Sequence, residues 1–213
     1  MQTIRIAIVV AAGAAALSLG SCATISEDQC LAGAWGEVGL ADGRSGYRPE
    51  RLNSHAEACA KVGVVPDEAV YMAAREEGLR SYCTPANGFQ AGRNGNAYEG
   101  VCPAFSEGAF VEAYQDGRLL GAAERAVSDA AGRVSSYGSR AQELDDKIEA
   151  KRRECRDETL AEEVRSLACD RVGELRAERE GTLREWRRAQ DDLRWAEREL
   201  QDVRWRLGSL HAF

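Results

Sequence analysis

The longest regular pattern of apolar positions lies in the second half of the chain. Apolar side chains recur with three-four spacing from residue 120 to residue 155, and a second run of this kind extends from residue 168 to residue 210. Sustained heptads with charged residues at the other positions are typical of coiled coils. The pattern predicts a long helical arm over residues 122–213.

Side-chain size indicates how the two runs pair. If a turn near residue 162 folds the second run back on the first, Ala123 meets Leu200 and Ala130 meets Leu193. Large side chains then face small ones almost throughout, which fills space without overlap. We therefore expect an antiparallel hairpin within a monomeric chain. The alternative is a coiled coil between chains.

The pattern in residues 22–121 is shorter and is interrupted by glycine and proline. Ser26 and Gln29 have the spacing of a capping box, which predicts the start of a helix. Pro49 and Pro66 each begin a further helical segment, because proline suits the first turn of a helix. We expect an all-α fold, in which a small helical head precedes the coiled-coil hairpin.

Three stripes of small residues at helical spacing recur in this head. Their members are Trp35, Gly39 and Gly43, then Tyr71, Ala74 and Gly78, then Phe110, Ala113, Gly117 and Gly121. Glycine costs about 1 kcal/mol relative to alanine inside a helix, so the stripes predict close approach of a neighbouring helix. An internal repeat of roughly 35 to 40 residues would explain them. Composition bias in a glycine-rich chain is the alternative.

Residues 84–103 are rich in turn formers and predict an irregular surface loop. Loops carry binding residues more often than packed helices do. The candidate binding residues are Phe89 and Tyr98 in this segment, together with Trp35 in the first stripe.

The first 21 residues have the pattern of a secretory signal peptide. Arg5 precedes an uncharged apolar run from residue 6 to residue 19, which is shorter than the roughly 20 residues of a membrane-spanning helix. Leu19, Gly20 and Ser21 then stand directly before Cys22, as in a bacterial lipobox. We expect residues 1–21 to be removed and Cys22 to carry a covalent lipid that anchors the chain. An ordinary signal beside an incidental cysteine is the alternative.

The net negative charge of the chain argues against nucleic acid as a partner. The chain has 28 basic and 35 acidic residues and a net charge of -7, and removal of residues 1–21 takes away only one charge, that of Arg5. An acidic chain of this kind does not offer a broad surface for nucleic acid. The residue after Cys22 is Ala23 rather than aspartate, which favours the outer membrane as the destination.

Six cysteines remain besides Cys22. An even number in an oxidising compartment indicates three disulfides. The distribution along the chain favours sequential pairs: Cys30 with Cys59, Cys83 with Cys102, and Cys155 with Cys169. A metal site is disfavoured, because the chain has no Cys-x-x-Cys spacing and only two histidines, His55 and His211.

The head resembles a family of Gram-negative envelope lipoproteins catalogued as domain of unknown function 2799. The resemblance covers roughly residues 22–121 and includes the strings Tyr82-Cys83-Thr84-Pro85 and Val101-Cys102-Pro103. The other matching residues are Cys30, Trp35, Gly39, Asp42, Gly43, Gly46, His55, Cys59, Pro66, Asp67, Tyr71, Gly78, Leu79, Asn87, Gly88, Gly92, Gly95, Tyr98, Gly100 and Tyr114. The resemblance implies an envelope location and a cysteine framework, and it implies no activity.

No arrangement of residues in the sequence indicates catalysis. An enzyme needs a nucleophile with a base, paired carboxylates or a metal centre, and His55 is expected on a helix surface or at a cap. We expect an outer-membrane lipoprotein on the periplasmic face that acts as a structural or interaction module, with an envelope protein as its partner. It needs no cofactor beyond the lipid on Cys22. A small-ligand or cell-wall-binding module using residues 84–103 is the alternative, and an enzyme depending on His55 or Asp42 is a third possibility.

Overall fold

The computed structural model describes residues 25–208, and every regular element in this range is an α-helix. The all-α prediction is confirmed. The predicted signal peptide, residues 1–21, and the predicted lipidation site, Cys22, lie outside the described residues. Among the helices that are described, none is both long and apolar enough to cross a membrane.

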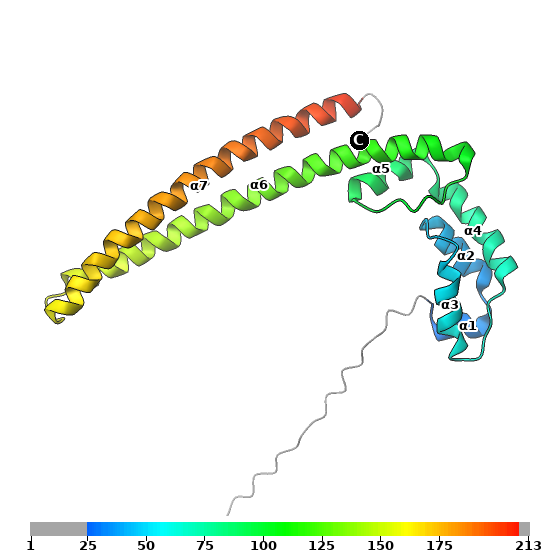
Figure 1. Ribbon diagram of the computed structural model, residues 1–213, viewed down its shortest axis with the longest axis horizontal. Helices are drawn as coiled ribbons and strands as arrows, with labels where there is room; N and C mark the ends of the chain where they lie inside the picture. The colour runs from blue at the N-terminus through cyan, green and yellow to red at the C-terminus, as the bar shows by residue number, and fades with distance from the viewer. Residues whose placement is uncertain (1–24, 209–213) are drawn as a thin grey trace, which may run out of the picture.

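Among residues 25–208, five short helices lie in the head and two long ones form the arm, the first of which begins within the head (Figure 1). In chain order they are α1 (Glu27–Ala32), α2 (Trp35–Arg44), α3 (Arg51–Ala60), α4 (Glu68–Tyr82), α5 (Pro85–Asn94), α6 (Ala104–Arg156) and α7 (Glu162–Gly208). The predicted capping box starts α1: the Gln29 N–H donates to Ser26 Oγ at 3.2 Å, and the Ser26 N–H donates to Gln29 Oε1 at 3.0 Å.

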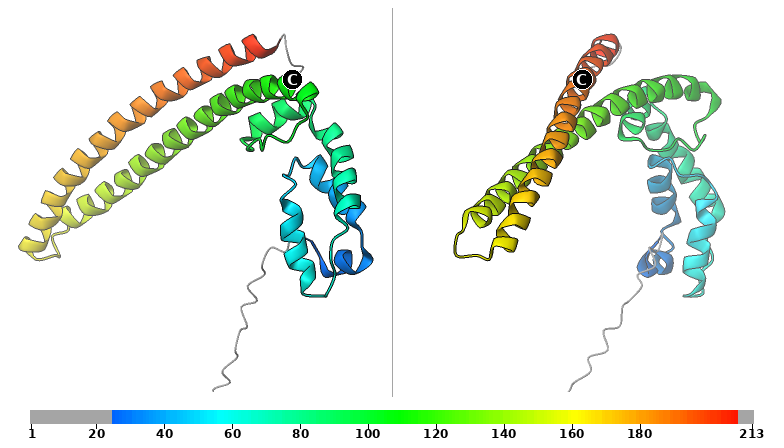
Figure 2. Two further views of the ribbon diagram at one scale, coloured as in Figure 1. Left: turned by 45° about the vertical axis from the view of Figure 1, so that its right-hand side comes forward. Right: turned by 60° about the vertical axis from the view of Figure 1, so that its left-hand side comes forward.

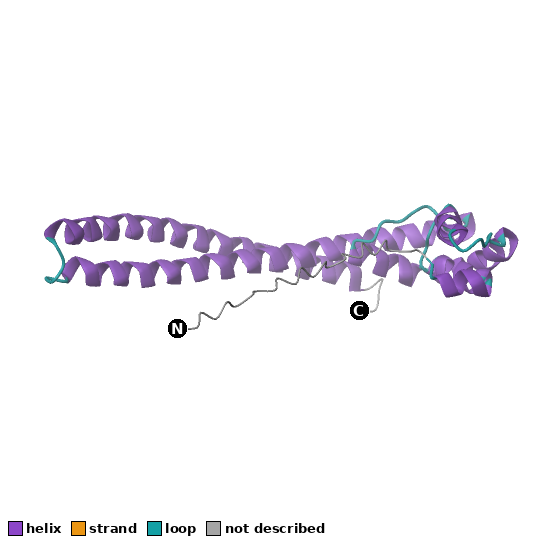
Figure 3. Cartoon of the chain, turned by 90° about the horizontal axis from the view of Figure 1, so that it is seen from below, coloured by secondary structure: helices purple, strands orange, loops and turns teal. Residues whose placement is uncertain are grey.

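The two long helices lie side by side and antiparallel, joined by a short turn at the tip (Figure 3). Ile148 and Leu175, which the predicted register pairs, lie in one buried cluster. The predicted register pairs Tyr137 with Trp186. A Cβ atom on the next residue, Gly138, would stand 3.5 Å from Trp186 Nε1. The hairpin is therefore formed within one chain, close to the predicted register.

Three disulfides staple the chain, and they are the sequential pairs that the sequence favours. Two lie in the head, Cys30–Cys59 and Cys83–Cys102. The third, Cys155–Cys169, ties α6 to α7 near the tip. The disulfides thus fix short local loops and leave the long-range order of the head to helix packing.

The head and the arm share a helix. α6 has 53 residues and runs without a break through residue 121, where the sequence suggests the end of the head. At the other end of the arm, Val203 and Leu207 of α7 pack in the same buried cluster as Phe89 of α5. The arm is therefore joined to the head both covalently and by packing (Figure 2).

The prediction that residues 84–103 form one irregular loop is wrong, because residues 85–94 form α5. Thr84 caps this helix by accepting a hydrogen bond from the Asn87 N–H at 3.3 Å, and Pro85 opens its first turn. The glycines that follow Thr84 and Pro85 are typical of loops, so the sequence did not indicate a helix here. Gly88 and Gly92 are stripe residues like those of the predicted stripes, and they press α5 against α6.

The glycine stripes join the helices in pairs, α2 with α4 and α5 with α6. In the first unit, residues 25–82, a Cβ on Gly39 would lie 2.2 Å from the Tyr71 carbonyl oxygen. In the second unit, residues 83–121, a Cβ on Gly88 would lie 2.4 Å from the Phe110 carbonyl oxygen. No side chain fits at such distances, so the helix backbones touch directly.

The two units repeat one another in detail. Arg75 donates to the Tyr47 carbonyl oxygen at 3.0 Å, and Tyr114 at the equivalent position donates to the Asn96 carbonyl oxygen at 2.9 Å. Gly46 and Gly95, directly before these carbonyls, both have positive φ, at 70° and 77°. An internal repeat is therefore present, but it differs from the predicted one: the repeated unit is a pair of stripe helices that occurs twice, and not a single stripe of roughly 35 to 40 residues that occurs three times.

The first unit has two elements that the second lacks: α1, which precedes the helix pair, and α3, which lies between its two helices. Gly39 and Tyr71 are 32 positions apart, whereas Gly88 and Phe110 are 22 apart. The difference equals the length of α3, which has 10 residues. The helix α3 is therefore an addition to the repeated pair.

Candidate functional site

A buried polar cluster holds the additional helix α3 against the α2–α4 pair. His55 Nε2 lies 2.7 Å from Asp42 Oδ2, and the Tyr71 hydroxyl donates to the same oxygen at 2.7 Å. Arg51 Nε donates to Asp42 Oδ1 at 3.3 Å. Asp42 is 6% exposed, and both His55 and Tyr71 are fully buried. The carboxylate of Asp42 thus gathers donors from α3 and α4.

The repeat offers an internal comparison for this cluster. The position of Asp42 is occupied by Ala91 in the second unit, and that of Tyr71 by Phe110. The second helix pair therefore packs with apolar residues where the first has polar ones. Helix pairing alone does not require the polar cluster, which accompanies α3.

Burial and hydrogen bonding keep Tyr71 in its neutral form. Desolvation raises the pKa of the Tyr71 hydroxyl well above its usual range, and the hydrogen bond to Asp42 raises it further. His55 has no exposed surface. Proton transfer from His55 to a molecule in solution would require the packing around α3 to open.

A pocket of about 690 Å³ opens between the two units, next to this cluster. Its first wall is the connection from α2 into α3, and its second wall combines Tyr82 and Ala91 with the segment after α5. The residues lining it are Ser45, Gly46, Tyr47, Arg48, Glu50, Arg51, Ser54, Tyr82, Ala91, Asn96, Ala97 and Glu99.

Arg51 links the buried cluster to the pocket. Its guanidinium carbon stands 3.8 Å from the centroid of the Tyr47 ring, while its Nε is held by Asp42. Arg48 lies 3.9 Å from Glu50 and 4.0 Å from Glu99. The pocket therefore presents both signs of charge beside an aromatic ring, a set that suits a zwitterionic or carboxylate-bearing small molecule.

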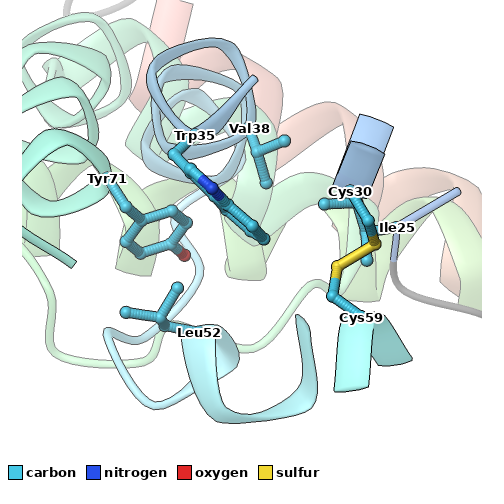
Figure 4. Packing of buried hydrophobic residues seen from close by; sticks show 7 residues of the cluster. All are labelled: Ile25, Cys30, Trp35, Val38, Leu52, Cys59 and Tyr71. Atoms are coloured by element: carbon cyan, nitrogen blue, oxygen red, sulfur yellow. A yellow bond between two sulfur atoms is a disulfide. The ribbon is translucent and has the colours of Figure 1, made fainter. Parts of the chain in front are cut away.

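The structure separates the three candidate binding residues. Trp35 is 4% exposed and belongs to the first unit's core, among Tyr71, Leu52 and the Cys30–Cys59 disulfide (Figure 4). Phe89 is also 4% exposed, in the cluster that joins α5 to the arm. They do not form one binding surface.

Tyr98, the third candidate binding residue, packs against the start of α6. Its ring centroid is 4.8 Å from that of Phe110, and its hydroxyl donates to Glu107 at 3.0 Å and accepts from the Cys102 N–H at 3.0 Å. Tyr98 therefore secures the connection before α6. Its neighbours Asn96, Ala97 and Glu99, which the sequence did not single out, line the pocket.

The expectation that His55 lies on a helix surface or at a cap is wrong, since the residue is fully buried. Its partner Asp42 is 13 positions away, and Tyr71 is 29 positions from Asp42, so local patterns do not reveal the cluster. Within residues 25–208 no three His, Cys, Asp or Glu side chains are placed to hold a metal ion.

The arm presents a different kind of candidate surface. Trp195 is 61% exposed and Trp205 is 83% exposed, both on α7. Exposed aromatic side chains of this size are enriched in protein interfaces. Salt bridges cover much of the remaining arm surface, which is typical of a solvated helix.

These features define a class of protein: an all-α, disulfide-stapled head built from a duplicated helix pair, extended by a coiled-coil arm. Residues 34–119, within the head, match the family described as protein of unknown function (DUF2799). The matched range covers α2 to α5 and the start of α6, whereas α1 and most of the arm lie beyond it. No curated protein and no solved structure matches the chain.

Proposed function

We propose that this protein is a non-enzymatic lipoprotein of the outer membrane, whose head is held at the periplasmic face and whose arm binds an envelope protein. The lipobox before Cys22 supports the anchor, and three disulfides suit an oxidising compartment. The observation that carries the proposal is the arm, because a hairpin of two helices with 53 and 47 residues exposes Trp195 and Trp205.

The arm is a long rod. From residue 122 to Cys155 the helix advances by roughly 50 Å at about 1.5 Å per residue. The Cys155–Cys169 disulfide closes the tip, so the two helices cannot separate there. The stapled hairpin holds Trp195 and Trp205 in a defined place on the part of α7 that returns to the head, where Val203 and Leu207 pack with Phe89.

The test is crosslinking in intact cells followed by purification of the full-length protein. The double variant Trp195→Ala/Trp205→Ala should lose at least about nine-tenths of its partner crosslinks, because exposed aromatic anchors dominate interface energies. Leu119→Ala, which changes a residue of α6 that is 56% exposed in the head, is the control and should keep them. Unchanged crosslinks in the double variant would contradict the role of the arm.

A second candidate function is binding of a small ligand in the pocket between the units. The observation favouring it is the fixed position of Arg51, held by Asp42 and stacked on Tyr47 at the pocket wall. We expect a short peptide with free amino and carboxyl groups, as in cell-wall stem peptides, to bind the wild type. Arg51→Ala should weaken that binding at least about tenfold in calorimetry, since a charged hydrogen bond contributes about 1.5 to 3 kcal/mol. Exposed Arg80, outside this pocket, supplies the matched control Arg80→Ala.

A further inference from the structure

The distance from the proposed lipid to the packed head is very short. Only Ala23 and Thr24 stand between Cys22 and Ile25, and Ile25 is 5% exposed in a core cluster with Cys30 and Cys59. A chain advances at most about 3.6 Å per residue. The Cα atoms of Cys22 and Ile25 are therefore within about 11 Å of one another, roughly the diameter of one helix.

The end of the first unit that contains Cys30 and Cys59 also carries exposed apolar residues. Leu31, 62% exposed, directly follows Cys30 of the disulfide. Val65, 84% exposed, follows Val64, whose N–H donates to the Cys59 carbonyl oxygen at 3.1 Å. The residue before each of them, Cys30 or Val64, is bonded to Cys59. Leu31 and Val65 therefore lie at the end of the head that contains α1 and the α3–α4 connection (Figure 1).

The charges at this end decide which lipid it fits. Glu27 and Asp28 are exposed in the first turn of α1, and Lys61 follows α3. This is not the cluster of basic residues that draws proteins to anionic lipids. Carboxylates beside apolar side chains suit a zwitterionic layer, in which the ammonium of phosphatidylethanolamine pairs with the acids.

We propose that the Cys30–Cys59 end of the head docks on the bilayer, with Leu31 and Val65 among the headgroups of zwitterionic lipid. This contact rests on the proposed acylation of Cys22, which brings the surface within reach. It fixes the orientation of the head, which the lipid alone leaves free to rotate. It also turns the pocket toward the periplasm, because Arg51 and Cys59 lie at opposite ends of α3.

The test uses the full-length acylated protein in vesicles of phosphatidylethanolamine with a small fraction of phosphatidylglycerol. A photoreactive benzophenone amino acid replaces Leu31, Val65 or, as the control, Leu119, which has similar exposure but lies in the second unit. After irradiation, lipid adducts are counted by mass spectrometry. We expect at least about five times more adducts from positions 31 and 65 than from 119, and no loss in 0.5 M salt.

The outcomes separate this contact from the anchor. Protein that is acylated and floats with the vesicles, but gives equal adducts at 31 and 119, would overturn the docking surface and leave the anchor intact. Protein that lacks acyl chains and does not float would overturn both. Adducts that depend on phosphatidylglycerol and vanish in salt would show electrostatic attachment to anionic lipid instead.

Discussion

At the scale of single residues, the packing of the first unit depends most on Asp42. It accepts hydrogen bonds from Tyr71 and Arg51 and contacts His55, and all of these contacts hold α3 or α4. Removing one member of a buried charged group leaves the others unpaired and costs more than the group contributes as a whole. The residues around Asp42 therefore differ sharply in how well they tolerate change.

Asp42→Ala should lower the free energy of unfolding by about 3 kcal/mol, because it removes the buried carboxylate to which Tyr71 and Arg51 donate. Tyr71→Phe should cost only about 1 kcal/mol, since it removes one hydrogen bond and keeps the ring. The second unit already has Phe110 at that position. Urea unfolding followed by circular dichroism measures both. Equal losses in the two variants would show that Asp42 is not the organising residue.

The raised pKa of Tyr71 predicts a loss of stability at alkaline pH. In the unfolded chain the hydroxyl ionises near pH 10, whereas in the folded chain burial holds it neutral to higher pH. Its contribution is complete below pH 10 and declines as pH rises above that value. The urea midpoint should fall as the pH rises from about 10 toward about 12, and Tyr71→Phe should make the fall shallower. A midpoint that falls equally in wild type and variant would contradict this assignment.

At the scale of helices, backbone contact through glycine determines which helices pair. A Cβ on Gly117 would lie 2.0 Å from the Phe89 carbonyl oxygen, while nothing stands within 4 Å of such an atom on Gly132 of the same helix. The two positions therefore make a matched pair in α6, one in close contact and one open.

Gly117→Ala should lower the free energy of unfolding by about 3 kcal/mol, because α5 and α6 must move apart. Gly132→Ala should raise it by up to about 1 kcal/mol, since alanine favours the helix and meets no neighbour. Urea unfolding of both variants measures the difference. A neutral Gly117→Ala would mean that the two helices are not in backbone contact.

The disulfide at the tip should act locally. Cys155→Ser/Cys169→Ser should reduce stability by about 2 to 3 kcal/mol, as expected for a loop of this size. Amide hydrogen exchange should accelerate in the last turns of α6 and the first turns of α7. Exchange in α2 and α4, which the disulfide does not touch, should stay as in the wild type and serves as the control.

The arm was predictable from sequence and the internal organisation of the head was not, for physical reasons. The hairpin depends on periodicity and on neighbouring large and small residues, which a sequence displays directly. In the head, the stripe at Gly39 gives no indication that it faces Tyr71 rather than another helix. The capping pair Thr84 and Pro85 did mark the start of α5, but the following glycines resemble those of a loop.

The pocket was even less accessible to sequence reasoning. Arg51 belongs to α3, while Asn96 and Glu99 belong to the segment after α5, and only the folding of both units brings them to one place. In the sequence, His55 and Asp42 are alternative residues on which an enzyme could depend. The structure brings them within 2.7 Å, in a buried position where they support α3.

At the scale of the whole molecule, shape is the dominant property. A compact chain of the described length would have a radius of gyration of about 16 Å. The arm extends far beyond the head in every view (Figure 2). We expect small-angle scattering of the mature domain to give a radius at least about 1.5 times the compact value, with the mass of one chain. A mass of two chains would favour the intermolecular coiled coil.

The arm does not continue in line with the first unit. Figure 1 shows that it turns away from the top of the head and slopes down to the lower left, so that its tip lies at about the height of α1 in that view. With the Cys30–Cys59 end on the lipid, the arm would run sideways over the membrane. A partner that binds Trp195 and Trp205 would then lie beside the head, since Val203 and Leu207 of the same part of α7 pack with Phe89.

Because α6 runs unbroken from the head to the tip of the arm, a rotation of the head moves the tip. The same helix packs against α5 at one end and carries the disulfide-closed tip at the other. Because a helix bends little over this length, a tilt of about 10° at the head would displace the far end, roughly 50 Å away, by about 9 Å. A small change in how the head is seated, or in what fills its pocket, would therefore move the disulfide-closed tip much further than the head itself.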